Sequence, residues 1–214
     1  VKEAGMAGSD VKAVFVEADT DAADPDGVAA SQTPSGAGNL TINGAKASGG
    51  VATFTAARQV TITSAGDDQA RTFTITGTDV NGDALTEAVT GADTDTATST
   101  KHFKTVTQIA VDDATAGAVT AGMNTSAIAV VFAGRSRLKG AFIVNSATAG
   151  SVLFRDSSDA GESGSTLLQL GTVASATAER DVTIPEQGIA FISGIFVPYT
   201  AGTTVWTNMT VFHA

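Results

Sequence analysis

The sequence has no cysteine and few of several other residue types. Among its 214 residues, Pro occurs four times, Trp once, Tyr once and His twice. The absence of Cys excludes a disulfide framework, a Cys-ligated zinc site and a thiol nucleophile. The longest apolar run, 127–133, is far shorter than the ~20 residues of a membrane-spanning helix, so the sequence predicts no membrane segment.

Lysine and arginine are also scarce. Twelve basic residues stand against 22 acidic ones, which gives a formal net charge of -10 at pH 7. Proteins that bind nucleic acids in general need basic residues to replace the counterions around phosphates. The same attraction holds peripheral proteins on anionic membranes. We therefore expect neither a nucleic acid nor a membrane as a partner.

Residues that form the solvent-facing side of helices are rare as well. Charged residues make up 16% of the chain, against a usual ~25%, and Thr leads the uncharged polar residues that replace them. We find no sustained helical spacing of apolar residues with caps. Short alternating segments recur instead, such as Thr72–Thr76, in which Phe73 and Ile75 share one face. This pattern indicates half-buried β-strands.

Three further segments carry specific strand signals. Asn81-Gly82 is the strongest hairpin sequence in the chain, so Leu85–Val89 is expected to return as a partner strand. The apolar positions of Phe103–Val111 change parity, which predicts a strand with a bulge. Ile189–Val197 is apolar at both parities and predicts a strand covered on both faces.

The composition of the chain changes near Gly122. Residues 1–122 carry 16 acidic and 7 basic residues, whereas 123–214 carry 6 and 5. We predict an all-β protein of two antiparallel β-sandwich domains, Ig-like or jelly-roll-like. The first, 1–122, is an acidic, Thr-rich β domain whose residues 1–50 are rich in loops, with Asp19–Gly38 as an exposed arm or loop. The second, 123–214, is a less charged β-sandwich.

The sequence contains no recognisable catalytic constellation. His102 and His213 are not accompanied by a G-x-S-x-G elbow, and neither a phosphate-binding glycine loop nor a zinc-ligand spacing is present. We therefore predict that the protein is not an enzyme and has no catalytic residue, cofactor or metal site. Two acidic loops, Asp19–Asp26 and Asp79–Asp83, offer the oxygen ligands that calcium prefers but complete no calcium loop. Calcium binding stays open at both.

Five residues are candidates for contacts with partner proteins. Arg135, Arg137 and Lys139 share parity, so on a strand they form one basic stripe. Such a stripe suits an acidic partner surface, or alternatively a solvated strand edge that resists aggregation. Trp206 and Phe212 also share parity, while other apolar residues take the opposite face of the same strand. One apolar face is expected to serve the core and the other a subunit contact.

Two stretches of the chain resemble modules of tailed-bacteriophage virion proteins. In the first stretch, the resemblance is carried by Arg58–Gly66, Thr72–Gly82, Thr86–Gly91 and Thr98–Val106. In the second stretch, it is carried by Leu138–Gly140, Val152–Asp156, Ile184–Phe191 and Val211–His213. Together these segments cover roughly residues 58–213.

The resemblance implies a non-enzymatic structural protein of the virion, with no catalytic residues to carry over. Our main interpretation is a head-decoration or cement protein on the capsid surface, which binds the assembled capsid and stabilises contacts between its subunits. The partners are then the major capsid protein and further copies of this chain, for which a homotrimer would fit the local threefold sites of a shell. The alternative is a tail or head fibre component, an adhesin that binds host-surface glycans. A connector in the neck is a further one.

Overall fold

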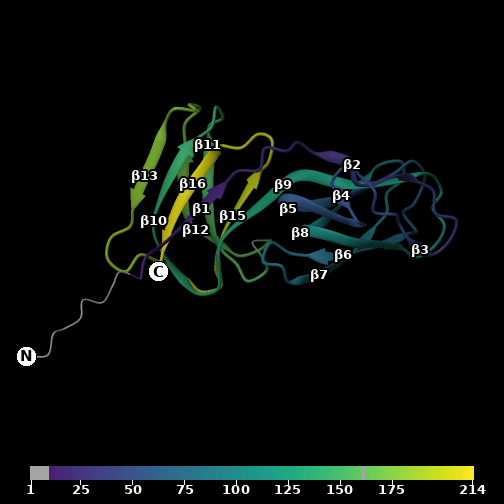
Figure 1. The fold of residues 1–214 in the computed structure, drawn as a ribbon, viewed down its shortest axis with the longest axis horizontal. Helices are drawn as coiled ribbons and strands as arrows, with labels where there is room; N and C mark the ends of the chain where they lie inside the picture. The colour runs from purple at the N-terminus through teal and green to yellow at the C-terminus, as the bar shows by residue number, and fades with distance from the viewer. Residues whose placement is uncertain (1–9, 161) are drawn as a thin grey trace, which may run out of the picture.

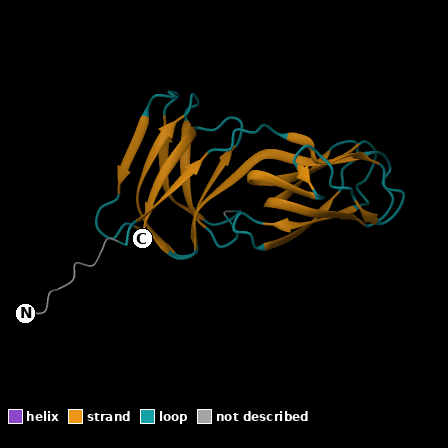
Figure 2. Cartoon of the chain, in the orientation of Figure 1, coloured by secondary structure: helices purple, strands orange, loops and turns teal. Residues whose placement is uncertain are grey.

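The protein is built from antiparallel β-strands. A computed structural model describes residues 10–160 and 162–214, and within them every regular element is a strand (Figure 1, Figure 2). This result confirms the predicted all-β class. No helix in the described ranges is long and apolar enough to cross a membrane.

The smaller of two sheets, sheet A, has five strands. They are β1 (Lys12–Glu17), β10 (Ser136–Asn145), β13 (Glu179–Thr183), β14 (Ile189–Phe191) and β16 (Trp206–His213). Their order is β1-β16-β10-β13, and β14 pairs with the beginning of β10. The first strand of the described residues therefore lies beside the last one.

The larger sheet, sheet B, has eleven strands. They are β2 (Asp24–Gln32), β3 (Gly38–Asn39), β4 (Ala47–Ser48), β5 (Val51–Ser64), β6 (Thr72–Thr78), β7 (Ala84–Thr90), β8 (Thr96–Val111), β9 (Val119–Ala133), β11 (Gly150–Asp156), β12 (Ser165–Thr172) and β15 (Gly194–Thr200). The main order is β12-β11-β15-β9-β5-β8-β6-β7. Three strands join the sides of this path: β2 pairs with β9, β3 with β8 and β4 with β5.

Two large hydrophobic cores give the molecule two lobes, joined by the long strand β9 (Figure 1). The first lobe surrounds a core from β2 and β5–β9 that includes Phe54, Phe73 and Phe103. In the second lobe, sheet A packs face to face on β9, β11, β12 and β15 around a core that includes Phe154 and Trp206. The predicted division near Gly122 falls inside β9, so the domain boundary stays a prediction.

The N-terminal part of the described chain crosses from one lobe to the other. β1 belongs to sheet A of the second lobe, and β2 then pairs with β9 in the first lobe. The expectation of an exposed loop at Asp19–Gly38 is wrong over Asp24–Gln32, which is a strand. The polar residues at its start and its glycine mask the apolar alternation that would predict a strand, although Val28 and Ala29 are fully buried. The pairing with β9 is irregular, as expected where so few residues are apolar.

The predicted hairpin around Asn81-Gly82 is confirmed. β6 and β7 pair from Thr72–Thr90 to Thr78–Ala84, and Gly82 has a φ of +89°. The Asp79 carboxylate accepts hydrogen bonds from the backbone N–H of Asn81 and of Asp83, at 2.8 and 2.9 Å. These bonds stabilise the turn, because the Asp79 carboxylate accepts hydrogen bonds from backbone N–H groups that lie beyond the paired residues of the two strands.

Ile189–Val197 forms two strands, not the single strand that its apolar run predicts. β14 pairs within sheet A and β15 within sheet B. Between them, the Asp156 carboxylate accepts hydrogen bonds from the backbone N–H groups of Ile192, Ser193 and Gly194. This turn lets the chain change sheets. The expected burial on both faces is confirmed for the middle of β15, where Ile195, Phe196 and Val197 are all buried.

Gly122 provides a test of how β2 packs on β9. A Cβ atom at Gly122 would lie 1.9 Å from the backbone oxygen of Asp24. We expect Gly122→Ala to displace β2 and to lower the free energy of unfolding by about 2 kcal/mol or more, because backbone cannot yield as a side-chain tip does. Gly36→Ala is the control, since its Cβ would have nothing within 4 Å. Urea denaturation that gives both variants the same midpoint would contradict this packing.

Candidate functional site

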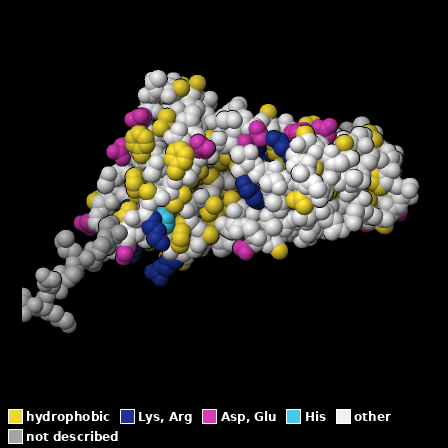
Figure 3. Space-filling view, viewed as in Figure 1, with side chains coloured by type: hydrophobic (Ala, Val, Ile, Leu, Met, Phe, Trp, Pro, Cys, Tyr) yellow, Lys and Arg dark blue, Asp and Glu magenta, His cyan; other side chains and the backbone are white. Residues whose placement is uncertain are grey.

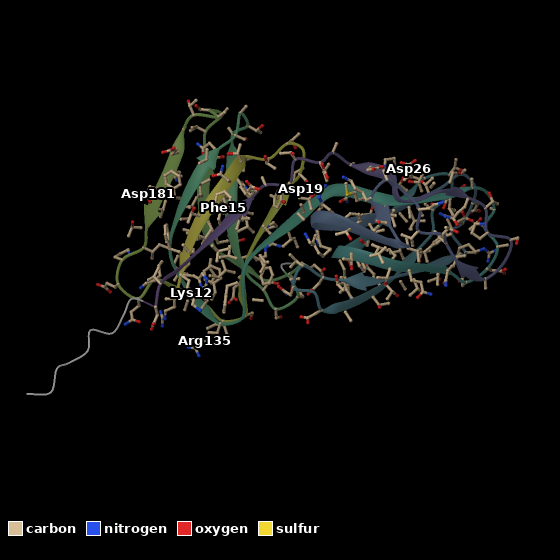
Figure 4. All side chains as sticks on the ribbon, in the orientation of Figure 1. Lys12, Phe15, Asp19, Asp26, Arg135 and Asp181 are labelled. Atoms are coloured by element: carbon tan, nitrogen blue, oxygen red, sulfur yellow. The ribbon has the colours of Figure 1, made fainter. Side chains whose placement is uncertain are left out.

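The predicted basic stripe lies at one end of sheet A. Arg135 is exposed in the turn before β10, and Arg137 and Lys139 follow on β10 with half-buried side chains. Arg137 Nη1 donates to the carbonyl oxygen of Gln187 at 3.3 Å, and Lys139 Nζ donates to that of Glu186. Figure 4 shows Arg135 at the margin of the second lobe. The three side chains therefore form a cluster on this lobe, which we call the basic cluster.

A shallow pocket of about 230 Å³ opens beside Arg135, and Lys12, Phe132 and His213 contribute to its lining. His213 Nδ1 lies 3.0 Å from Ser136 Oγ, and its ring centroid lies 4.9 Å from that of Phe132. Burial lowers the pKa of His213, and the nearby charge of Lys12 lowers it further. At neutral pH the positive charge here therefore comes from lysine and arginine side chains.

Trp206 and Phe212 do not share a face, although their sequence parity is the same. Phe212 is 36% exposed, whereas Trp206 is fully buried in the second core. The pairing of β16 with β10 shifts between the pairs Asn208–Val144 and Trp206–Asn145. Such a bulge turns the following side chains to the other face. The prediction of Trp206 as a partner contact is therefore wrong, and Phe212 stays a candidate.

The sequence analysis missed an exposed aromatic residue on β1. Phe15 is 61% exposed and pairs with Thr210 of β16. On the other side of Thr210 lies Phe142 of β10, so the two phenyl rings stand in the same row of sheet A. The alternation in Lys12–Glu17 could have indicated that Phe15 faces away from its apolar neighbours, but not which face is buried.

A buried ion pair joins the two lobes. Arg58 on β5 is fully buried, and its guanidinium lies 2.8 Å from the carboxylate of Asp19, in the segment between β1 and β2. The guanidinium also donates to the carbonyl oxygens of Asn124 and Asp21, at 2.8 and 2.9 Å. The backbone N–H of Asp19 donates to the hydroxyl oxygen of Tyr199, on β15, at 3.1 Å. Both lobes thus contribute to one polar network.

Tyr199 stays neutral within this network. Burial raises the pKa of Tyr199 to about 12, and the negative charge of Asp19 also acts in that direction. The Asp19 carboxylate accepts further hydrogen bonds from the backbone N–H groups of Ala56 and Asp21. A carboxylate with this many donors is held in place by them. The network therefore has a structural role, in which its ion pair and hydrogen bonds hold the two lobes together; we call it the joint between the lobes.

His102 occupies a second polar contact between the lobes. Its Nε2 lies 2.8 Å from Ser126 Oγ, and its backbone N–H donates to Glu162 Oε1 at 2.6 Å. A hydrolase triad needs an acidic group on the other ring nitrogen, but Nδ1 has no hydrogen-bond partner in the part of the chain that the structure describes. Burial lowers the pKa of His102 to about 4, against the opposite effect of Glu87. The ring is therefore neutral at pH 7.

The two acidic loops engage their carboxylates locally. Asp19 pairs with Arg58, Asp21 lies 2.6 Å from Lys46 Nζ, and Asp79 holds its own hairpin. Across residues 10–160 and 162–214, no group of three or more acidic or histidine side chains is placed to bind a metal ion.

Fold and surface together define an all-β protein of antiparallel sheets that has a basic cluster and exposed aromatic side chains on one lobe. Comparison with known families, with curated proteins and with solved structures gives no match. The function is therefore argued from the surfaces of the molecule.

The importance of the joint between the lobes is testable with Arg58→Met. This change leaves the Asp19 carboxylate buried without its cation, and we expect it to cost about 3–5 kcal/mol of stability. Lys46→Met is the matched control, because it removes a solvent-accessible ion pair and should cost less than about 1 kcal/mol. Chemical denaturation measures both. Equal losses in the two variants would show that the buried pair is not the joint we describe.

Burial of neutral His102 predicts that the protein loses stability in mild acid. The unfolded chain takes up this proton near pH 6.5 and the folded chain only near pH 4. His102 therefore costs nothing above pH 6.5, and stability falls by up to about 3 kcal/mol as the pH drops to 4. The lowered pKa of His213 adds to this loss, whereas the raised pKa of Glu162 opposes it.

The variant His102→Gln tests this assignment, because an amide keeps a hydrogen bond near Ser126 but does not titrate. We expect its free energy of unfolding to change much less between pH 6.5 and 4 than that of the unmodified protein, in urea titrations followed by circular dichroism. His213→Gln serves as the comparison. An unaltered pH dependence in His102→Gln would contradict the role of His102.

Proposed function

We propose that this protein is a non-enzymatic structural protein of a tailed-bacteriophage virion, a head-decoration or cement protein that binds the assembled capsid. Its second lobe contacts the shell, and its first lobe extends away from it. Binding to the assembled state alone stabilises that state by mass action. The proposal rests on the sequence resemblance and on how the two lobes divide their surface chemistry.

The distribution of exposed apolar side chains carries this proposal. Among the described residues, all the large hydrophobic side chains that are exposed belong to the second lobe: Val11, Phe15, Leu167, Val173, Ile192 and Phe212. The basic cluster lies on the same lobe (Figure 3). Exposed apolar patches next to charge are typical of protein–protein contacts.

The first lobe has the opposite character. Thirteen of the 22 acidic residues lie within 19–122, against five basic ones, and Thr fills the outward positions of strands such as β6. An acidic surface repels its copies on neighbouring particles and keeps the particles dispersed. A lobe of this kind suits the outer side of a shell, whereas the lobe with the exposed apolar side chains and the basic cluster suits the side that adheres.

The alternative, an adhesin for host-surface glycans, has less support. Sugar-binding sites usually offer aromatic rings as platforms. The single Trp, Trp206, is fully buried, and the single Tyr, Tyr199, is half-buried in the joint between the lobes. The exposed aromatic residues are phenylalanines in a strand face and not at a loop tip.

Co-sedimentation with capsids that lack this protein tests the proposal. We expect saturable binding, a higher melting temperature of the shell and weaker binding at high salt. Failure to bind such shells would remove the cement interpretation. Binding to host cells without binding to shells would favour the fibre alternative.

The basic cluster is tested with the triple variant R135Q/R137Q/K139Q. If these side chains meet an acidic partner surface, we expect the dissociation constant for shells to rise about tenfold or more and its salt dependence to decrease. The control K46Q/R71Q/K101Q removes the same charge from the first lobe and should bind as the unmodified protein does. The oligomeric state of both variants is measured in parallel, which separates shell binding from self-association.

A further inference from the structure

The outer face of sheet A is an apolar surface without a cover. The inner face of this sheet packs on the second core, whereas the side chains of its outer face are exposed or half-buried. Phe15 is 61% exposed, Phe212 is 36% exposed and Phe142 is half-buried. Hydrophobic side chains gather over these strands in Figure 3, and Figure 4 places Phe15 among them.

This face departs from the pattern that the rest of the chain follows. In β6, the inward positions are Phe73 and Ile75, and the outward positions are all threonine. Threonine fits a pleated surface that contacts water. Sheet A instead has phenylalanine at outward positions of β1, β10 and β16. Large apolar side chains concentrated on one face indicate that another surface covers it.

Charges of opposite sign occupy the two ends of the same face. Lys139 of β10 lies at one end of this face, beyond the Gly140–Phe212 pair, and Glu17 of β1 lies at the other end, in the row of Asn208. Glu179 pairs across β10 at the same end as Glu17, and Asp181 lies beside Phe142. The face is thus basic at one end, aromatic in the middle and acidic at the other.

We infer that a second copy of this chain binds this face, with the strands of the two sheets antiparallel across the interface. A twofold axis in the interface plane and perpendicular to the strands reverses the face end for end. It therefore places Lys139 of one copy near Glu179 of the other, twice. It also brings Phe15, Phe142 and Phe212 of both copies together. Such an isologous contact needs only that a surface complement itself, which the order of charges here provides.

The size of the face sets the strength of the contact. The four strands have six, eight, ten and five residues, and at a spacing of ~4.8 Å and a rise of ~3.3 Å per residue they give a footprint of about 450 Å² for each copy. The total of about 900 Å² is below the ~1,200 Å² at which stable specific interfaces begin. The dimer is therefore weak and concentration-dependent. This inference does not depend on the capsid proposal, because it concerns the protein alone in solution.

Sedimentation equilibrium of the full chain over a range of concentrations tests the inference. We expect a monomer–dimer equilibrium, and we expect F15T/F212T to raise the dissociation constant about tenfold or more. Threonine preserves the β-strand, and circular dichroism checks the fold. The control V173T/I192T removes two residues that are 57% and 60% exposed but lie outside this face, and it should dimerise normally.

A charge exchange tests the direction of the two sheets. Glu179→Lys places like charges together in the twofold arrangement and should weaken the dimer, whereas adding Lys139→Glu to it should restore dimerisation. A double variant as weak as the single one would overturn the proposed geometry. A monomer at every concentration, a trimer, or equal loss of dimer in F15T/F212T and V173T/I192T would overturn the inference itself.

Discussion

The guanidinium of Arg58 has no access to water, and the region between the lobes is arranged to satisfy it. A buried charge costs several kcal/mol unless a counter-ion and hydrogen-bond acceptors surround it. The acceptors here come from the segment after β1 and from β9, and Tyr199 of β15 holds Asp19 from the second lobe. All of these hydrogen bonds can form together only if the elements that supply them keep one arrangement relative to each other. The buried pair therefore fixes how the lobes meet, beyond the continuity of β9.

Local alternation was enough to predict much of the first lobe. Phe73 and Ile75 are buried as their spacing indicates, and the Asn81-Gly82 turn joins the strands that flank it. These features depend on neighbours in sequence. The pairing of β1 with β16 depends on residues about 200 positions apart, and nothing in either segment specifies the other. Non-local pairing was therefore beyond the sequence argument.

Errors at the candidate site have the same origin. Parity placed Trp206 with Phe212, but a single irregular pair in β16 turned the tryptophan into the core. Parity also separated Phe15 from Val14 and Val16 without indicating which side is inward. In sheet A, Val14 and Val16 pack on the second core, and Phe15 between them lies on the outer face. The basic cluster was predictable because its three side chains need only a shared strand face.

A weak self-contact on the apolar lobe is compatible with a role on a particle surface. In dilute solution, a footprint of this size gives little association, so the free protein avoids open-ended aggregation while the acidic lobe adds repulsion. When many copies are held close together by another contact, the effective concentration rises and the same face becomes occupied. The exposed phenylalanines would then stabilise the assembled particle and cause no aggregation of the free protein before assembly. A chain that covers other strands with threonine would for this reason retain three phenylalanines on one outer face.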